Sequence, residues 1–355
     1  MTVNPPPPRA RLRALDGLRF LAAVAVVGYH YTGVRTGFWG TAPSNVFPTL
    51  NHVTRYGFIG VELFFVISGF VILMTAWRAP IERFTASRIA RLFPAYWAAV
   101  ILTAIMQYFW GGGRQPSLRE TLVNLTMLQD PFDIVDIQGA FWTLWIELKF
   151  YLLIGVFVLV GINRARVIAF AALWPLLSQI AQVTHAPMLG SLLIPSYAPY
   201  FAAGMALFLL YRDGNSVIVW LVLALDTILC LDQITDYAPR VSRYVGQEVS
   251  PAVCGVLVLV FIALVWAVSS GPLARIQWRW LTVAGALTYP LYLVHGQFGF
   301  MIIDLLHERL NAYVTLSVAV LVAVALAFAL HYLVERRFHD PLRGAVQRGL
   351  SDLKT

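Results

Sequence analysis

The sequence predicts an all-α protein, a polytopic integral membrane helix bundle of about ten transmembrane helices. Of its 355 residues, 59% are hydrophobic and only 12% are charged, whereas charged residues make up about a quarter of soluble domains. A soluble chain this apolar could not cover its surface with polar groups. Runs of about 20 apolar residues, the length that crosses a bilayer, lie near 14–33, 57–77, 91–110, 142–161, 165–183, 192–211, 216–232, 250–269, 280–303 and 312–335.

Basic residues between these runs orient the predicted bundle. Arg and Lys are enriched in cytoplasmic loops, and most of the 26 Lys and Arg residues fall on one side when ten spans are threaded through a membrane. Because ten is an even number, both termini are expected on that cytoplasmic side. The net charge of +8 is therefore interpreted as an orientation signal and not as a nucleic-acid surface.

The expected organisation is one membrane domain. Residues 1–13, which include the run Pro5–Pro8, are predicted to be a disordered cytoplasmic leader. Residues 14–340 are predicted to form the single transmembrane domain, and residues 341–355 a cytoplasmic tail. Neither Cys230 nor Cys254 belongs to a Cys-x-x-Cys pair, so no zinc or redox site is expected.

The first predicted span carries Arg19 and His30, and function is the default interpretation of ionisable residues there because charges in a membrane are costly. Arg19 and His30 are eleven residues apart, which at about 100° and 1.5 Å per residue puts them on one helical face, roughly 16 Å apart. A guanidinium suits a phosphate, and an imidazole suits proton abstraction near neutral pH. The alternative is an arginine and a histidine that merely reach the two interfaces.

Six segments resemble, in chain order, the motifs of the membrane-bound acyltransferase-3 family. The first runs from Leu15 to His30 and has ten residues between a basic residue and a histidine. The others are Gly60–Phe70, Arg88–Pro94, Trp142–Tyr151, Tyr289–His295 and Val334–Arg336. The resemblance covers nearly the whole chain, and the ordered set is far more specific than any one motif.

The resemblance implies a multi-pass cell-membrane enzyme, with the domain at 14–340 as its acyltransferase domain. It would move an acyl group, expected to be acetyl, from acyl-CoA to a hydroxyl of a sugar-containing acceptor. Such acceptors include envelope glycans, glycolipids and glycosylated natural products of the macrolide type. Acyl-CoA is then a donor substrate, and no tightly bound cofactor, metal ion or nucleic-acid partner is expected.

The candidate site residues fall into a catalytic, a donor-binding and an acceptor-binding group. In the first, a histidine is the general base and one of two carboxylates orients it; in the second, arginines hold the phosphates of coenzyme A. The catalytic group is His30, Glu62 and Glu147, and the donor-binding group is Arg19, Arg88 and Arg91. The acceptor-binding group is Tyr151, Tyr292 and His295.

Each assignment has an alternative. For Arg88 and Arg91 it is anchoring at the cytoplasmic face. For Glu62 it is a structural ion pair, and for His295 a hydrogen bond inside the bundle. His331 and Glu335, four residues apart, are interpreted as a structural pair. For the whole chain the alternative is a secondary transporter, which also buries charges near the midplane. The sequence shows no paired inverted halves, so the enzyme is favoured.

Overall fold

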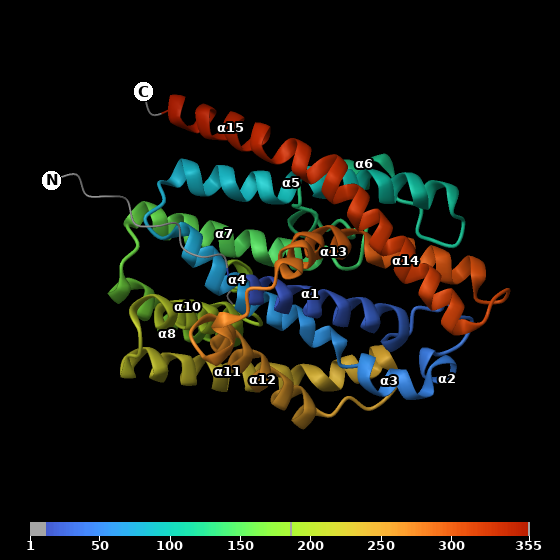
Figure 1. Ribbon diagram of the computed structural model, residues 1–355, viewed down its shortest axis with the longest axis horizontal. Helices are drawn as coiled ribbons and strands as arrows, with labels where there is room; N and C mark the ends of the chain where they lie inside the picture. Colours follow the sequence, from blue (N-terminus) through green and yellow to red (C-terminus); the bar gives the residue numbers. More distant parts are fainter. Residues whose placement is uncertain (1–11, 185–186, 354–355) are drawn as a thin grey trace.

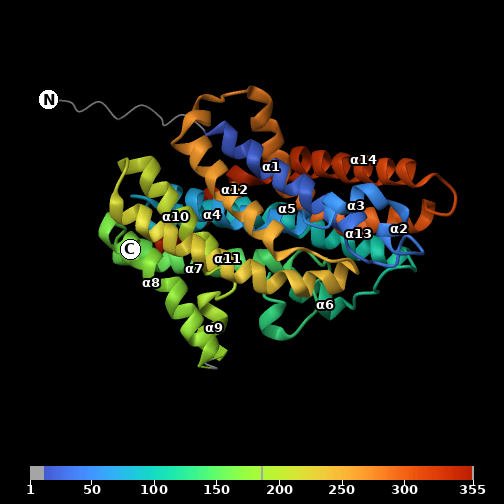
Figure 2. The ribbon, with the colours of Figure 1, turned by 90° about the horizontal axis from the view of Figure 1, so that it is seen from below.

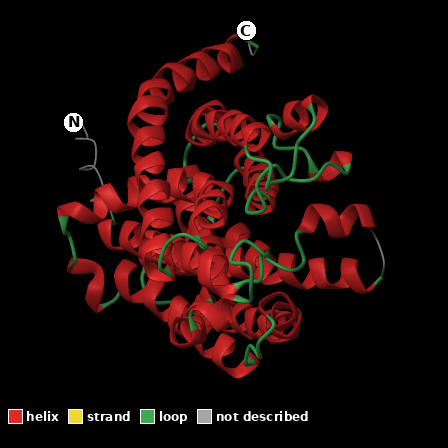
Figure 3. Cartoon of the chain, turned by 90° about the vertical axis from the view of Figure 1, so that its right-hand side faces the viewer, coloured by secondary structure: helices red, strands yellow, loops and turns green. Residues whose placement is uncertain are grey.

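The computed structural model describes residues 12–184 and 187–353, and all regular structure in these ranges is helical (Figure 3). A helix forms at each of the ten expected spans. These helices are α1 (Arg13–Gly28), α4 (Gly60–Ala76), α5 (Ile81–Phe109), α7 (Trp142–Val160), α8 (Arg164–Val183), α10 (Ala198–Asp213), α11 (Val217–Val245), α12 (Pro251–Ser269), α13 (Arg279–Leu306) and α14 (Ala312–Leu330).

Shorter elements connect or extend these helices. The α-helices among them are α2 (Pro43–Val46), α3 (Pro48–Thr54), α6 (Leu118–Asn124), α9 (Pro187–Leu193) and α15 (Arg336–Asp352). There are 3₁₀ turns at Gly57–Ile59, Asp130–Phe132 and Pro272–Arg275, and π-helical turns at Tyr29–Gly33 and His331–Glu335. In Figure 2, α9 and the end of α8 project from the body of the bundle.

The helices confirm an all-α, multi-pass membrane protein. Within the described residues, eight helices are long and apolar enough to cross a membrane. Of the ten expected spans, α1 and α13 are the two outside that set, and they carry Arg19, His30 and His295 in or next to them. Both helices therefore hold candidate site residues, as do α4, α5 and α7 within the set of eight. The number ten and the cytoplasmic termini stay predictions.

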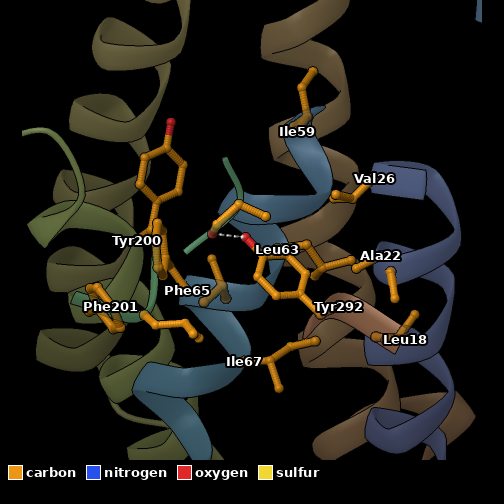
Figure 4. Packing of buried hydrophobic residues seen from close by; sticks show 14 of the residues in the cluster. Leu18, Ala22, Val26, Ile59, Leu63, Phe65, Ile67, Tyr200, Phe201 and Tyr292 are labelled. Atoms are coloured by element: carbon orange, nitrogen blue, oxygen red, sulfur yellow. Dashed lines mark hydrogen bonds between the residues drawn. The ribbon is translucent and has the colours of Figure 1, made fainter. Parts of the chain in front are cut away.

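The core of the bundle forms where α4 packs between α1 and α10 (Figures 1 and 4). Leu18, Ala22 and Val26 of α1 face α4, and Phe201 of α10 packs on its other side. Gly69 of α4 lies so close to α10 that an added Cβ would collide with the Phe201 carbonyl oxygen. Small residues allow this backbone approach in membrane bundles, so α4 is held rigidly between its neighbours.

The structure describes much of the expected tail but little of the expected leader. Of the expected leader, residues 1–11 lie outside the described residues, and α1 begins at Arg13. The segment expected as a tail, 341–355, belongs to α15 as far as Asp352. This helix follows α14 through a π-helical turn and packs along α5 (Figure 1). It therefore adds a wall to the bundle beside α5.

Candidate active site

A π-helical turn at the end of α1 carries His30. The turn spans Tyr29–Gly33, and π-helical segments occur often at functional sites. The Tyr31 hydroxyl donates to the backbone carbonyl of His295 at 2.6 Å, and the Trp39 indole donates to the Tyr31 carbonyl at 2.8 Å. These bonds fix the end of α1 against α13.

His30 and His295 form a hydrogen-bonded pair. His295 Nε2 lies 3.2 Å from His30 Nδ1, and the two rings meet edge to face with 4.9 Å between their centroids. His295 is fully buried. Two residues 265 positions apart in the chain therefore contact each other through α1 and α13.

Backbone carbonyls determine the proton positions in this pair. His295 Nδ1 lies 2.8 Å from the Tyr292 oxygen and 3.2 Å from the Leu291 oxygen. A carbonyl only accepts, so this Nδ1 carries the proton and the Nε2 of the neutral ring is an acceptor. His30 Nδ1 faces two acceptors, the Val26 oxygen at 2.9 Å and His295 Nε2 at 3.2 Å, so it carries the proton and shares it between them. It follows that the Nε2 of neutral His30 has a free lone pair, as a general base requires.

A glutamine side chain supports the helical turn that contains His295. The buried Gln138, from the loop before α7, donates its amide N–H to the Leu293 carbonyl. Its amide oxygen accepts from the backbone N–H of Gln297 at 2.6 Å. One side chain thus bridges the two sides of this turn, and sequence reasoning missed it because the loop shows no motif at that position.

A cavity of about 320 Å³, the main cavity, lies beside this pair. Its walls come from α1, α4, α5, α7, α13 and α15. The predicted site residues among its lining are Arg19, Arg88, Arg91, Glu147, Tyr151 and Tyr292. Sequence reasoning assigned no site role to the lining residues Asp16, Ser87, Tyr289 and His339.

Two of the cavity's arginines have no carboxylate at ion-pair distance in the described part of the chain. Arg19 makes no hydrogen bond or ion pair among those residues, and Arg88 donates only to the Ser87 hydroxyl at 3.0 Å. The buried Nε of Arg88 has no hydrogen-bond partner there. Guanidinium groups bind phosphate with charge-assisted, often bidentate hydrogen bonds, so this wall is suited to a phosphate-bearing ligand.

Arg91 is engaged differently. It forms an ion pair with the buried Glu335, whose other oxygen lies 2.8 Å from His331 Nδ1. The expected pair of His331 and Glu335 is confirmed, with Arg91 as a third member. Since Glu335 immediately precedes α15, this group fastens α15 to α5.

The remaining wall residues bond to one another. The Tyr151 hydroxyl donates to Glu147 Oε1 at 2.7 Å, and the Ser68 hydroxyl donates to the same oxygen at 3.3 Å. The Tyr292 hydroxyl donates to the Ala140 carbonyl at 2.9 Å. The ring of Tyr292 lies 5.6 Å from that of His295, so Tyr292 links the main cavity to the histidine pair. His30 and His295 do not line this cavity themselves.

The two carboxylates expected to orient His30 lie elsewhere. No carboxylate among the described residues lies within hydrogen-bond distance of His30, and His295 occupies that position. Glu147 bonds to Tyr151 instead. Glu62 does not line the cavity although its neighbour Val61 does, because adjacent residues of a helix point in different directions. Its buried Oε2 has no hydrogen-bond partner in the described residues.

The fold and the site together define a multi-pass membrane protein with a histidine pair beside a cationic cavity. The profile of the acyltransferase-3 family, an acyltransferase domain, matches residues 12–335. The chain therefore belongs to this family of membrane acyltransferases.

Curated relatives agree with this assignment. The peptidoglycan O-acetyltransferase OatA of Listeria monocytogenes is 27% identical over 44% of this chain and 26% of its own length. The acyltransferase MdmB of Streptomyces mycarofaciens is 29% identical over 41% of this chain and 39% of its own. The chain thus aligns with about a quarter of the length of OatA and about two fifths of the length of MdmB. No solved structure matches significantly.

Proposed function

We propose that this protein is an integral membrane O-acyltransferase that moves an acyl group, most simply acetyl, from acyl-CoA to a hydroxyl of a sugar-containing acceptor. The observation that carries this is the position of His30 Nδ1 beside two acceptors, the Val26 oxygen and His295 Nε2, which puts the ring proton on Nδ1 and leaves Nε2 as the base. Both relatives are named as acyltransferases, which supports acyl transfer. The name of OatA, a peptidoglycan O-acetyltransferase, supports a glycan acceptor.

The reaction follows from the proton positions. His30 Nε2 takes the proton of the acceptor hydroxyl as its oxygen attacks the thioester carbonyl carbon. When the tetrahedral intermediate collapses, the C–S bond breaks, and the thiolate leaves with the proton returned by the imidazolium. His295 holds the His30 ring and accepts from Nδ1–H throughout. His295 is thus a positioning residue in this proposal, whereas the sequence left acceptor binding and a hydrogen bond inside the bundle as two equal alternatives.

The donor is proposed to lie in the main cavity. Arg19 and Arg88 line it without a described carboxylate partner, so a diphosphate would supply their missing counter-charges. The thioester would then extend past Tyr292 towards the histidine pair, since Tyr292 contacts both regions. Glu147 and Tyr151 remain candidates for contacts with either substrate.

The test is a transfer assay with the purified protein in nanodiscs, labelled acetyl-CoA and a panel of glycans and glycosides. His30→Ala should lower turnover by about 10²–10⁴-fold because a general base is lost, while binding of coenzyme A changes little. Arg19→Ala should weaken binding as well, and Arg19→Lys should partly restore it. Near wild-type transfer by His30→Ala would refute the mechanism, and a protein that neither binds nor uses acetyl-CoA would refute the donor.

A further inference from the structure

A second, smaller cavity opens beside the main cavity. This side cavity has a volume of about 210 Å³ and is lined by Thr75, Ala79, Arg83, Phe84, Ser87, Arg88 and Arg343. Ser87 and Arg88 also line the main cavity, so the two spaces share a wall. The side cavity and the main cavity therefore adjoin each other at Ser87 and Arg88.

The lining of the side cavity is positively charged. Three of its lining residues are arginines, and none is acidic. Over residues 12–184 and 187–353, neither Arg83 nor Arg343 has a carboxylate within ion-pair distance. Three positive charges around so small a space repel one another, and a compact dianion would compensate them.

The terminal helix contributes to both cavities. His339 lines the main cavity and Arg343 lines the side cavity. These residues are four apart in α15 and therefore share a face. The Arg91–Glu335 ion pair and the packing of α15 along α5 hold that face over the cavities.

From this arrangement we infer that the side cavity binds a phosphomonoester, the 3′-phosphate on the ribose of the coenzyme A donor, through Arg83 and Arg343. The inference rests on the proposed donor. Coenzyme A carries its diphosphate and its 3′-phosphate on the same nucleotide, and the structure provides two adjoining cationic spaces. An anionic lipid headgroup has similar chemistry, but the wall shared with the main cavity favours the donor.

The test compares coenzyme A with 3′-dephospho-coenzyme A, which differ only in this phosphate. Binding is measured by calorimetry on the full chain in nanodiscs of neutral lipid, so that transfer activity is not required. The wild type should bind coenzyme A at least about tenfold more tightly than 3′-dephospho-coenzyme A, as expected for charge-assisted hydrogen bonds. Arg343→Gln and Arg83→Gln should weaken coenzyme A binding and leave dephospho-coenzyme A binding unchanged. Arg348→Gln is the matched control, because Arg348 lies on α15, is exposed and lines neither cavity.

Each outcome decides one hypothesis. Equal binding of both compounds by the wild type, or a parallel loss of both in Arg343→Gln, would overturn the phosphate site and leave the proposed function standing. Absence of coenzyme A binding would overturn the site together with the proposed donor. If Arg343→Gln changes only the protein's response to added phosphatidylglycerol, the side cavity binds lipid and the inference is wrong.

Discussion

At the scale of single residues, the contact between His295 and His30 makes a specific claim about catalysis. His295 does not line the main cavity, yet its Nε2 is the hydrogen-bond partner of His30 Nδ1. A group that holds a base in the right tautomer affects turnover more than substrate binding. This role differs from acceptor binding, so kinetics can separate the two.

We expect His295→Leu to lower kcat by about 10²-fold with little change in the KM values for donor and acceptor. His295→Gln should retain much more activity, since its amide oxygen can accept from His30 Nδ1–H. Steady-state kinetics of both variants with each substrate varied is the measurement. A raised acceptor KM at unchanged kcat would instead assign His295 to acceptor binding.

Arg88 and Arg91 were expected to act alike, and the structure separates them. Arg88→Ala should raise the KM for acetyl-CoA by about tenfold or more, because a charge-assisted phosphate contact is lost. Arg91→Ala should mainly lower thermal stability, because it leaves the buried Glu335 without its cation. Donor titrations and melting curves of both variants check this. The opposite pattern, with Arg91→Ala stable but weak in donor binding, would restore the original assignment.

At the scale of elements, α1 and α13 meet at the histidine pair, and each departs from regular α-helix near it. α1 ends in a π-helical turn, and α13 contains Pro290 and the turn bridged by Gln138. Both departures from regular helix lie within a few residues of His30 or His295. The bridging glutamine is the more testable of these features, because it can be replaced without changing its volume greatly.

Gln138→Met should lower kcat because the turn that holds His295 loses both hydrogen bonds. It should also destabilise the protein by about 1–3 kcal/mol, the cost of buried groups left without partners. Turnover and melting temperature are measured together, with Gln115→Met as a control, because the Gln115 amide donates to the Gln107 and Trp110 carbonyls and not to the turn that holds His295. A fall in stability with unchanged kcat would limit Gln138 to a structural role.

At the scale of the whole molecule, the topology connects the site to the two sides of the membrane. The loop charges predict ten spans with both termini in the cytoplasm. Under that topology the basic residues around the main cavity and the side cavity face the cytoplasm, the side from which the proposed acyl-CoA donor would enter.

Reporter fusions at Thr355, and at the start of the chain, should therefore both report the cytoplasm. A fusion in the loop at Gly111–Arg114, after α5, should report the opposite side. Two termini on opposite faces would contradict the even number of spans.

The sequence alone determined the class of fold and family, because apolar runs of membrane length and motifs in order are properties of the chain itself. It also placed Arg19, Arg88, Glu147, Tyr151 and Tyr292 as candidates, and the structure brings all five to one cavity. Only the tertiary structure decided which groups contact His30. Helical periodicity gives the direction of a side chain on its own helix, but not which distant helix faces it. For this reason Glu62 was expected beside His30, and packing of α1 on α13 placed His295 there instead.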